Sequence, residues 1–592
     1  MDRIVPAETP VAAALTDWLA ACNQALARGD AAAVAALFES EGHLRDLVAL
    51  GWQVRTVSGR DAVAALLRES LPAAGLRGLR VAAGRTPPRR VHRAGRDVLE
   101  AMVDFDTAHG SGAGVLRLVD DPEGPGGLRA WIVLLSLRSL RGHEEASNAC
   151  GSQGRDHYLR DFGGENWEDK RRRAARFEDH DPAVLVVGAG QAGLSIAARL
   201  GQLGVDTLVV DREARVGDNW RQRYHALTLH NEVHVNHLPY MPFPTTWPVF
   251  IPKDKLANWF ESYVDSLDLR VWTGTELVSG HHDAQAGHWT LTVRRADGSQ
   301  REMRPRHVIF ATGVSAIPVM PDQPGLASFA GTVMHSGRYT SGAAWKGRPA
   351  LVLGTGNSGH DVAQDLHAAG AQVTLIQRSP TYVVSIQEAQ RVYALYAEGM
   401  PTDDCDLLAT AMPYPVLRHA YQLSTAVSRE ADRALLQGLA ARGFRLTEGE
   451  DRTGFQMMYL RRGGGYYFNV GCSDLIAQGR VGLVQHEDIE RFVPEGVRLR
   501  DGRVLPAELL VMATGYHNQQ EVVRRSLGDA VADRIGRVWG VDTDGELRNL
   551  WRPTPQPGLW FIAGSLAQCR IYSRFLALQI KAREEGLAPY AS

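Results

Sequence analysis

The chain contains the run Val184-Leu185-Val186-Val187-Gly188-Ala189-Gly190-Gln191-Ala192-Gly193, in which an apolar strand enters a glycine-rich turn and an apolar-periodic helix follows. Gly188 permits the tight turn, Gly190 lets backbone amides approach a pyrophosphate, and Gly193 lets the helix pack closely on the strand. A second strand ends at Asp211, about 20 residues beyond the glycines, where a ribose-binding carboxylate belongs. This order predicts a dinucleotide site, in which Gln191 opens the helix.

The same pattern occurs again further along the chain. A strand at 350–353 leads into Gly354-Thr355-Gly356-Asn357-Ser358-Gly359, and the strand at 372–376 is followed by Gln377-Arg378. Arg378 can accept a 2′-phosphate that an acid would repel, so this site is predicted to bind NADPH rather than NADH. The alternative is that these glycines only build a turn. Two such sites predict a flavin and a nicotinamide brought together for hydride transfer.

Composition narrows the class of protein. A chain of 592 residues is expected to form two or three domains, and Lys+Arg 65 against Asp+Glu 67 gives a net charge of -2, which does not predict a nucleic-acid partner. We expect a cytoplasmic protein without a membrane span, because neither a signal pattern nor an apolar run of about 18 residues is present. Scattered cysteines predict neither disulfides nor a metal site: Cys22, Cys150, Cys405, Cys472 and Cys569.

Residues 1–142 are predicted to form a separate unit, with helices first and an antiparallel sheet afterwards. This α+β cone resembles the NTF2-like (SnoaL-like) family in the run Gly42-His43-Leu44-Arg45-Asp46-Leu47-Val48 and in a helix-opening Gly59-Arg60-Asp61-Ala62. The resemblance allows an acid–base pair made of His43 and Asp46. The alternative, which we favour, places these residues in a surface turn beside a strand, in a module that docks or dimerises without catalysis.

Residues 143–180 are polar and glycine-rich, and are predicted to connect this unit to the next. The basic run Lys170-Arg171-Arg172-Arg173 is interpreted as a solvated helix face; a nuclear address or an anion patch is the alternative. Trp167 and Phe177 are expected to fix the connector to a neighbouring domain.

The remainder resembles the flavin-containing monooxygenase family of class B flavoprotein monooxygenases. The resemblance rests on both glycine motifs, on two Ala-Thr-Gly strand ends, at Thr312-Gly313 and Thr514-Gly515, and on a fingerprint of the form F-x-G-x-x-x-H-x-x-x-[YF], present as Phe329, Gly331, His335 and Tyr339. Three departures are Asp211 in place of a commoner glutamate, Gly217-Asp218 in place of Gly-Gly, and Thr340 after the fingerprint tyrosine.

The resemblance implies a fold of two dinucleotide-binding Rossmann-type domains, for FAD and NADPH. It divides the chain into a first FAD-binding part at 181–345, an NADP-binding domain with a helical substrate-side insertion at 346–485, and a C-terminal FAD-binding part at 486–592. Aromatic and methionine residues of the insertion either line a substrate channel or belong to the core: Tyr382, Phe455, Met457, Met458, Tyr459, Tyr466 and Tyr467.

The resemblance also implies the site. NADPH reduces FAD, oxygen adds to form a C4a-peroxyflavin, and a small organic substrate is oxygenated. Asn231 matches the family's asparagine beside the flavin, where an amide can donate and accept hydrogen bonds at once, although it could instead cap a loop. His230 is a second candidate for that wall, and Asn219-Trp220 is expected to touch the flavin.

Three functions remain open at this point. Tyr339-Thr340 favours oxygenation of nitrogen or sulfur, such as N,N-dimethylaniline monooxygenase activity, since Baeyer–Villiger relatives end the fingerprint in Trp. A Baeyer–Villiger or 2-oxo-acid oxygenase resembling the indole-3-pyruvate monooxygenases is the second. The third is a flavin-binding partner protein that docks through its N-terminal cone. Expected partners are a small-molecule substrate and molecular oxygen, with a homodimer as a further possibility.

Overall fold

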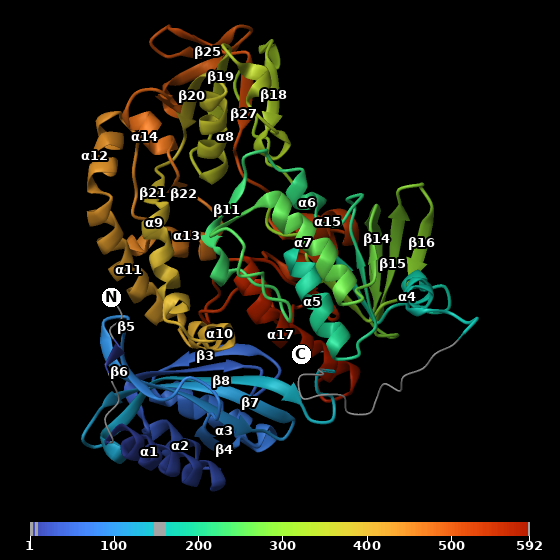
Figure 1. Cartoon of the computed structure of the whole chain (residues 1–592), viewed down its shortest axis with the longest axis vertical. Coiled ribbons are helices and arrows are strands. Elements are labelled where there is room, and N and C mark those ends of the chain that lie inside the picture. Colours follow the sequence, from blue (N-terminus) through green and yellow to red (C-terminus); the bar gives the residue numbers. More distant parts are fainter. Residues whose placement is uncertain (1–3, 6–9, 147–161, 590–592) are drawn as a thin grey trace.

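The computed structural model describes residues 4–5, 10–146 and 162–589, so that Cys150 and part of the connector lie outside the described residues. The fold is mixed α/β. Figure 1 shows an N-terminal unit in blue, two units built on parallel sheets, and a set of helices in yellow and orange beside the second sheet. Within the described residues, no helix is both long and apolar enough to cross a membrane.

The N-terminal unit, residues 4–146, packs three helices on one face of an eight-stranded sheet. Its helices are α1 (Pro10–Ala27), α2 (Ala31–Ala36) and α3 (Arg60–Ala74). Its strands, in sheet order, are β1 (Ile4–Val5), β5 (Arg89–Arg93), β6 (Arg96–Asp106), β7 (Gly110–Asp120), β8 (Leu128–Leu140), β2 (Phe38–Leu47) and β3 (Val54–Ser58), with β4 (Arg77–Val81) paired to β6.

This sheet is not purely antiparallel, as it was predicted to be. β2 runs parallel to β8, whereas the other pairs are antiparallel, so the sheet is mixed rather than purely antiparallel. Local alternation of apolar residues reports that a strand exists and not which distant strand it joins. Most residues of β7 and β8 are buried, because the face away from α1–α3 is covered by the rest of the chain.

The prediction of a surface turn at His43 and Asp46 is wrong, because both residues lie inside β2 and are buried. They do not form an acid–base pair either. Three positions apart on a strand, they point to opposite faces of the sheet. His43 Nδ1 lies 2.8 Å from Ser58 Oγ, while Asp46 accepts backbone N–H bonds from Ala49 at 2.8 Å and Leu50 at 3.0 Å. Asp46 therefore shapes the turn after β2.

The first parallel unit is a five-stranded sheet in the order β13 (Val271–Trp272), β10 (Thr207–Val210), β9 (Val184–Val187), β17 (His307–Phe310), β28 (Leu559–Phe561). Its helices are α5 (Gln191–Gln202), α6 (Asp218–Arg221), α7 (Lys253–Ser266) and α17 (Leu566–Glu584), with α15 (Gln519–Leu527) and α16 (Asp529–Ile535) nearby. Smaller sheets pair β11 (Thr228–Glu232) with β12 (Phe250–Pro252), and β15 (His288–Arg295) with β14 (Thr275–Asp283) and β16 (Gln300–Met303).

The second parallel unit has the strand order β18 (Thr332–His335), β27 (Leu509–Met512), β19 (Pro349–Leu353), β20 (Gln372–Gln377), β23 (Gly482–Gln485), with α8 (Asn357–Ala368) after β19. This sheet crosses both predicted boundaries, since β18 precedes 346 and β27 follows 485. A parallel sheet collects strands by crossover connections, so its central strands need not be neighbours in sequence. A small sheet of β24 (Ile489–Val493), β25 (Gly496–Leu499) and β26 (Val504–Pro506) precedes β27.

An insertion between β20 and β23 supplies the helices beside the second sheet. It contains β21 (Tyr382–Ser385), which pairs in parallel with β22 (Tyr466–Asn469). Its helices are α9 (Ile386–Ala389), α10 (Thr402–Thr410), α11 (Tyr414–Ala431), α12 (Arg433–Ala441), α13 (Gly454–Arg462) and α14 (Cys472–Ala477), with a 3₁₀ segment at Gln390–Ala397. Figure 1 shows α10 lying against the blue N-terminal sheet.

The connector prediction is correct for one aromatic residue and wrong for the other. Phe177 is fully buried against Trp272 and Arg270, whereas Trp167 is 58 % exposed and lies under the guanidinium of Arg171 in its own helix. The basic run lies in α4 (Trp167–Arg176), where most of its residues face solvent, as the solvated-face interpretation requires.

Candidate active site

One cavity of about 1970 Å³ lies where the units meet. Its wall combines the glycine turn after β9, the strand β11, the beginning of α8, the aromatic residues of the insertion, and α17. The N-terminal unit also contributes to it, through Arg45, Val54, Arg93 and Arg117. Of the sequence-predicted residues, the lining brings together Gly188, Gly190, Gln191, Asp211, Asn219, Trp220, His230, Asn231, Thr312, Gly313 and Asn357.

The first glycine turn has the predicted division of tasks. Gly188 has φ +111°, and a Cβ there would lie 2.7 Å from the carbonyl oxygen of Ala311. A Cβ on Gly193 would lie 1.8 Å from the carbonyl oxygen of Gly188, so helix and strand approach too closely for any side chain. A Cβ on Gly190 would meet only the side-chain amide of Asn219, with Nδ2 at 3.0 Å. Gly190 therefore leaves open space at the beginning of α5, where backbone N–H groups favour an anion.

Asp211 lies beside this space at the end of β10. Its carboxylate accepts N–H bonds from Ala189 at 2.6 Å and Glu213 at 2.8 Å, which orient it toward the cavity it lines. Burial raises the pKa of Asp211 from its ordinary value. An oriented carboxylate at this position is the group expected to bind a ribose hydroxyl.

Further polar groups surround the same space. Gln191 Nε2 donates to the carbonyl oxygen of Gly564 at 3.3 Å, and Trp220 Nε1 donates to Gln191 Oε1 at 3.4 Å. The hydroxyl of Thr312, at the end of β17, is buried without a hydrogen-bond partner among the described residues. An unsatisfied hydroxyl in a glycine-lined cradle fits a bound dinucleotide such as FAD.

The second glycine turn repeats this geometry. Gly354 has φ +118°, and a Cβ there would lie 2.4 Å from the carbonyl oxygen of Ala513, while a Cβ on Gly359 would lie 2.0 Å from the carbonyl oxygen of Gly354. Gly356 precedes α8 without a side-chain cap, and a Cβ on it would be 3.7 Å from its nearest neighbour. Asn357 and Ser358 open that helix, and Asn357 Oδ1 accepts the backbone N–H of Phe468 at 3.0 Å. This cradle fits a second dinucleotide.

Arg378 and the second Ala-Thr-Gly strand end lie outside the cavity lining. Arg378 follows β20 with its side chain exposed, and among the described residues it has no ion-pair partner. It lies close to His486, whose pKa is lowered by burial and then by the charge of Arg378. Thr514 and Gly515 follow β27 and hold the segment 313–319 through a Thr514 Oγ1 bond to the carbonyl oxygen of Val319 at 2.6 Å. The contacts of Thr514 and Gly515 therefore serve to hold the neighbouring segment in place.

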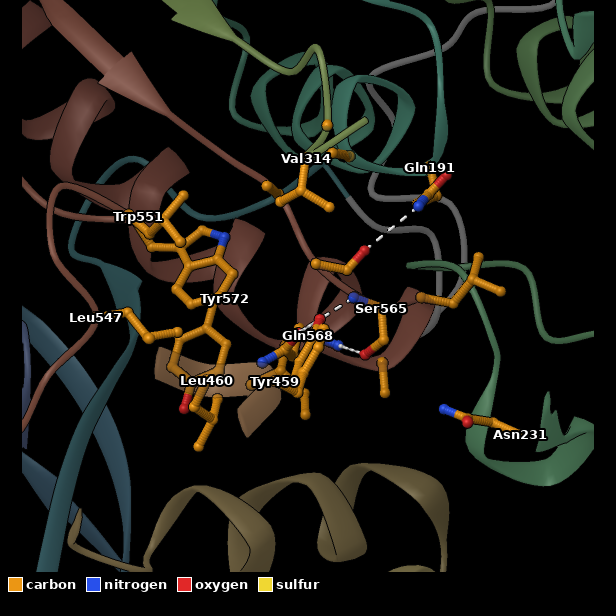
Figure 2. Close-up of a pocket in the computed structure, with 18 of the residues that line it drawn as sticks. Gln191, Asn231, Val314, Tyr459, Leu460, Leu547, Trp551, Ser565, Gln568 and Tyr572 are labelled. Atoms are coloured by element: carbon orange, nitrogen blue, oxygen red, sulfur yellow. Dashed lines mark hydrogen bonds between the residues drawn. The ribbon is translucent and has the colours of Figure 1, made fainter. Parts of the chain in front are cut away.

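Asn231 lies in β11 and faces the cavity. Its Nδ2 donates to the hydroxyl of Tyr393 at 3.1 Å, and its backbone carbonyl oxygen accepts from Asn236 Nδ2 at 3.0 Å. Figure 2 shows the Asn231 amide on the opposite side of the pocket from Trp551 and Tyr572. Burial raises the pKa of Tyr393 to about 12, so this hydroxyl stays protonated. The amide is thus part of the wall rather than a loop cap.

His230 links the two parallel units. Its Nε2 lies 3.9 Å from Asp361 Oδ2 on α8, and the same carboxylate oxygen accepts a short hydrogen bond from Tyr224. Burial lowers the pKa of His230 and raises that of Asp361. A neutral imidazole is therefore expected at this junction.

Aromatic residues form part of the cavity wall, and the sequence identified only some of them. Phe455, Tyr459 and Tyr466 line it as predicted for a channel, whereas Tyr382, Met457, Met458 and Tyr467 belong to the core. The hydroxyl of Tyr459 donates to Gln568 Oε1 at 2.7 Å. Trp551 stacks on Tyr572 with centroids 4.5 Å apart (Figure 2). No local sequence pattern marks these last residues.

Comparisons by family model, by sequence and by fold find related proteins of one kind. A family model described as flavin-binding monooxygenase-like matches residues 181–421. The chain is 30% identical over 362 residues to the indole-3-pyruvate monooxygenase YUCCA1 of Oryza sativa subsp. japonica, covering 61% of this chain and 83% of that protein. It is 29% identical over 339 residues to the probable indole-3-pyruvate monooxygenase YUCCA3 of Arabidopsis thaliana, covering 56% and 73%. The fold is similar to a cyclohexanone monooxygenase in an open crystal structure (TM-score 0.50, 19% identity, covering 69% of this chain and 88% of that one).

The two glycines of the first turn should respond differently to valine. Gly190→Val should fold normally but purify without FAD, because its side chain would displace only the side-chain amide of Asn219 and would otherwise enter the space of a bound pyrophosphate. Gly193→Val should lose FAD and also stability, by at least about 1–3 kcal/mol, because it forces helix and strand apart. Flavin absorbance per protein and the melting temperature measure the two effects. If Gly190→Val retained FAD, the first glycine turn would not be the FAD site.

Arg378→Ala should weaken NADPH binding by about 1.5–3 kcal/mol, the range for hydrogen bonds to charged groups. NADH lacks the 2′-phosphate and is the matched control ligand, whose affinity should stay nearly unchanged. Titration of both nucleotides into the FAD-loaded variant measures this. Equal losses for the two would show that Arg378 does not contact the 2′-phosphate.

Proposed function

We propose that this chain, which belongs to the flavin-binding monooxygenase-like family, oxygenates an aromatic 2-oxo acid. It is a flavin-dependent monooxygenase, with FAD and NADPH as cofactors. When bound, FAD reduced by NADPH supplies the activation of molecular oxygen. The overall reaction converts R–CO–COO⁻, O₂, NADPH and H⁺ into R–COO⁻, CO₂, NADP⁺ and H₂O, which balances atoms and charge.

We assign FAD to the first cradle, with Gly190, Asp211 and Thr312 facing it, and NADPH to the second, with Gly356 and Arg378. These residues provide the groups that a dinucleotide needs: uncapped helix N-termini for the phosphates, a carboxylate for a ribose, and an arginine for the 2′-phosphate.

The substrate proposal rests on hydrogen-bond donors of the cavity wall that have no partner among the described residues. Gln456 Nε2 is buried with no hydrogen-bond partner among the described residues, and the hydroxyls of Tyr421 and Tyr466 make no hydrogen bond to them. Burial raises the pKa of both tyrosines, so they stay protonated and can donate. These donors, set among aromatic rings, match a flat substrate whose polar groups are acceptors, such as carbonyl and carboxylate oxygens.

The bonding of the acidic residues that line the cavity also favours an acid as substrate. Each carboxylate that lines it, within the described residues, is already bonded to another group: Asp211 to backbone N–H groups, Glu213 to Gln222, Glu276 to Arg294, Glu398 to Arg89 and Arg93, and Glu546 to Arg45. Four of these carboxylates are paired with arginines, because Glu213 also lies 3.5 Å from Arg212, and the fifth, Asp211, is the one assigned to a ribose. A cationic amine would therefore find no unassigned counter-charge among them, and burying an unpaired cation is costly. An acceptor-rich acid does not have this difficulty.

Oxygenation at nitrogen or sulfur, the first expectation from the sequence, is the second candidate. It rests on Tyr339-Thr340. Tyr339 is buried, its hydroxyl donates to Asp365 at 2.6 Å, and it is absent from the cavity lining. The fingerprint tyrosine therefore holds α8 and does not contact a substrate, so it favours neither reaction.

The N-terminal unit is proposed to be an NTF2-like domain used for docking rather than chemistry. His43 and Asp46 point to opposite faces of the sheet, and Asp46 is used by the backbone of its own turn. The sheet face away from its helices is covered by the same chain, so a homodimer would need another surface.

Product analysis tests the substrate class. Indole-3-pyruvate and phenylpyruvate, given to the FAD-loaded protein with NADPH, should be converted to the acid one carbon shorter with release of CO₂. N,N-dimethylaniline, thioanisole and cyclohexanone are the comparison substrates and should be oxygenated at least about tenfold less efficiently, a difference of about 1.4 kcal/mol. N- or S-oxide as the main product would reverse the choice between the two candidates.

Asn231→Ala should uncouple the enzyme rather than stop it. Removing one preorganised donor where oxygen is activated typically costs about 2.7–4 kcal/mol, while reduction of the flavin by NADPH does not depend on this amide. NADPH oxidation should continue, with hydrogen peroxide replacing oxygenated product. Peroxide and product per NADPH are the measurement. Tyr393→Phe is the matched control: it removes the partner of Asn231 but keeps the amide, and should stay mostly coupled. Normal coupling in Asn231→Ala would rule out its role.

A further inference from the structure

The N-terminal unit contacts the insertion through a set of arginines. They converge on the segment 398–412, which contains α10. The bonds are Arg85 to Asp403 and Asp404, Arg89 and Arg93 to Glu398, Arg117 to the carbonyl oxygen of Leu408, Arg138 to Asp403, and Arg45 to the carbonyl oxygen of Thr410. Most of these groups are buried or half-buried, so the contact is a desolvated interface rather than surface ion pairing.

Arg45 is the member of this set that also bonds to the loop at Glu546 and to Tyr572 on α17. Its Nε and Nη2 donate to both oxygens of Glu546, at 2.8 and 2.7 Å, its Nη1 donates to the carbonyl oxygen of Thr410 at 2.6 Å, and Nη2 also reaches the hydroxyl of Tyr572 at 3.2 Å. Arg45 is 7 % exposed and Glu546 6 %. A planar guanidinium with all of these bonds fixes its partners in direction as well as distance.

The partners of Arg45 belong to three separate segments that meet at the cavity. Glu546 lies in the loop that continues to Leu547, Leu550 and Trp551, all of which line the cavity. Tyr572, on α17, lines it too and stacks on Trp551 at an interplanar angle of 16°. Figure 2 shows Leu547, Trp551 and Tyr572 together on one side of the pocket. One side chain of the N-terminal unit thus joins the loop, α10 and α17.

A second path leads from α10 to the opposite side of the cavity. Asp406 of α10 binds Arg570 of α17 with both oxygens, at 2.7 and 2.8 Å. Arg570 in turn donates to the carbonyl oxygen of Val235 at 2.9 Å, in the turn that follows Asn231. The segment that the N-terminal arginines hold is therefore also bonded to the turn beside the proposed catalytic amide.

We infer that the N-terminal unit completes the substrate cavity, and that Arg45 is a positioning residue which fixes the Trp551–Tyr572 wall. A buried ion pair is weak evidence for stability, because desolvation offsets much of its attraction. The geometry of Arg45 instead serves position, since this one side chain donates to all three segments of the wall at once. The inference rests on the cavity and not on which substrate occupies it.

Hydrogen exchange of the FAD-loaded full chain tests this, with Arg45→Met as the first variant. Backbone amides in 541–551 and 566–576 should exchange about tenfold faster than in the wild type, because the loop and α17 lose their common anchor. Arg90→Met is the matched control: Arg90 is an arginine of the same sheet, paired to Asp120 at the surface, and its loss should leave both segments unchanged.

The double variant Arg45→Met/Glu546→Met separates position from stability. It removes both charges, so no unpaired buried charge remains and the melting temperature should return toward the wild type, while exchange in 541–551 and 566–576 should stay fast. If Arg45→Met alone fails to fold, the double variant still tests whether Arg45 positions these two segments. Wild-type exchange in the folded double variant would overturn the inference, and because exchange needs no substrate, failure of the 2-oxo-acid proposal would leave it intact.

Discussion

The close approach of helix to strand at two glycines is the constraint on which the rest of this structure depends. Gly193 and Gly359 occupy equivalent places, where any side chain would overlap a carbonyl oxygen of the preceding turn. Because both helices are drawn against their sheets, their N-terminal N–H groups face open space instead of a side chain. Gly190 of the first turn and Asn357, which opens the helix after the second turn, line the same cavity.

Parts of the molecule that repeat a local rule could be predicted from the sequence. The spacing of the glycines and the acid after the second strand depend on residues close together in the chain, and the structure places Gly190, Asp211 and Asn357 at one cavity. The role of Arg378, which lies outside that lining, stays a prediction. Rules of this kind say nothing about partners far apart. Arg45 and Glu546 are separated by 501 positions, and neither stands in a pattern that suggests the other.

The same distinction explains the errors. The sheet of the second parallel unit takes strands from both sides of its predicted limits, since crossover connections hide which strands are neighbours. The polar residue types of His43 and Asp46 favour a surface turn, yet a strand covered on both faces buries them. In the insertion, Tyr421 and Gln456 matter through the direction in which their polar atoms point, and amphipathic periodicity does not encode that direction.

The double covering of β7 and β8 has a consequence for synthesis. The N-terminal unit is synthesised first. The face of its sheet that later segments cover stays exposed to water until residues 402–412 and 541–574 have left the ribosome. That face carries apolar residues such as Val115, Ile132 and Leu134 together with Arg45 and Arg117, and Glu100 already binds Arg89, Arg93 and Arg117 from within the same unit. Charged groups that are already paired within the unit interrupt this apolar surface, which lowers its tendency to associate with other chains before the later segments are made.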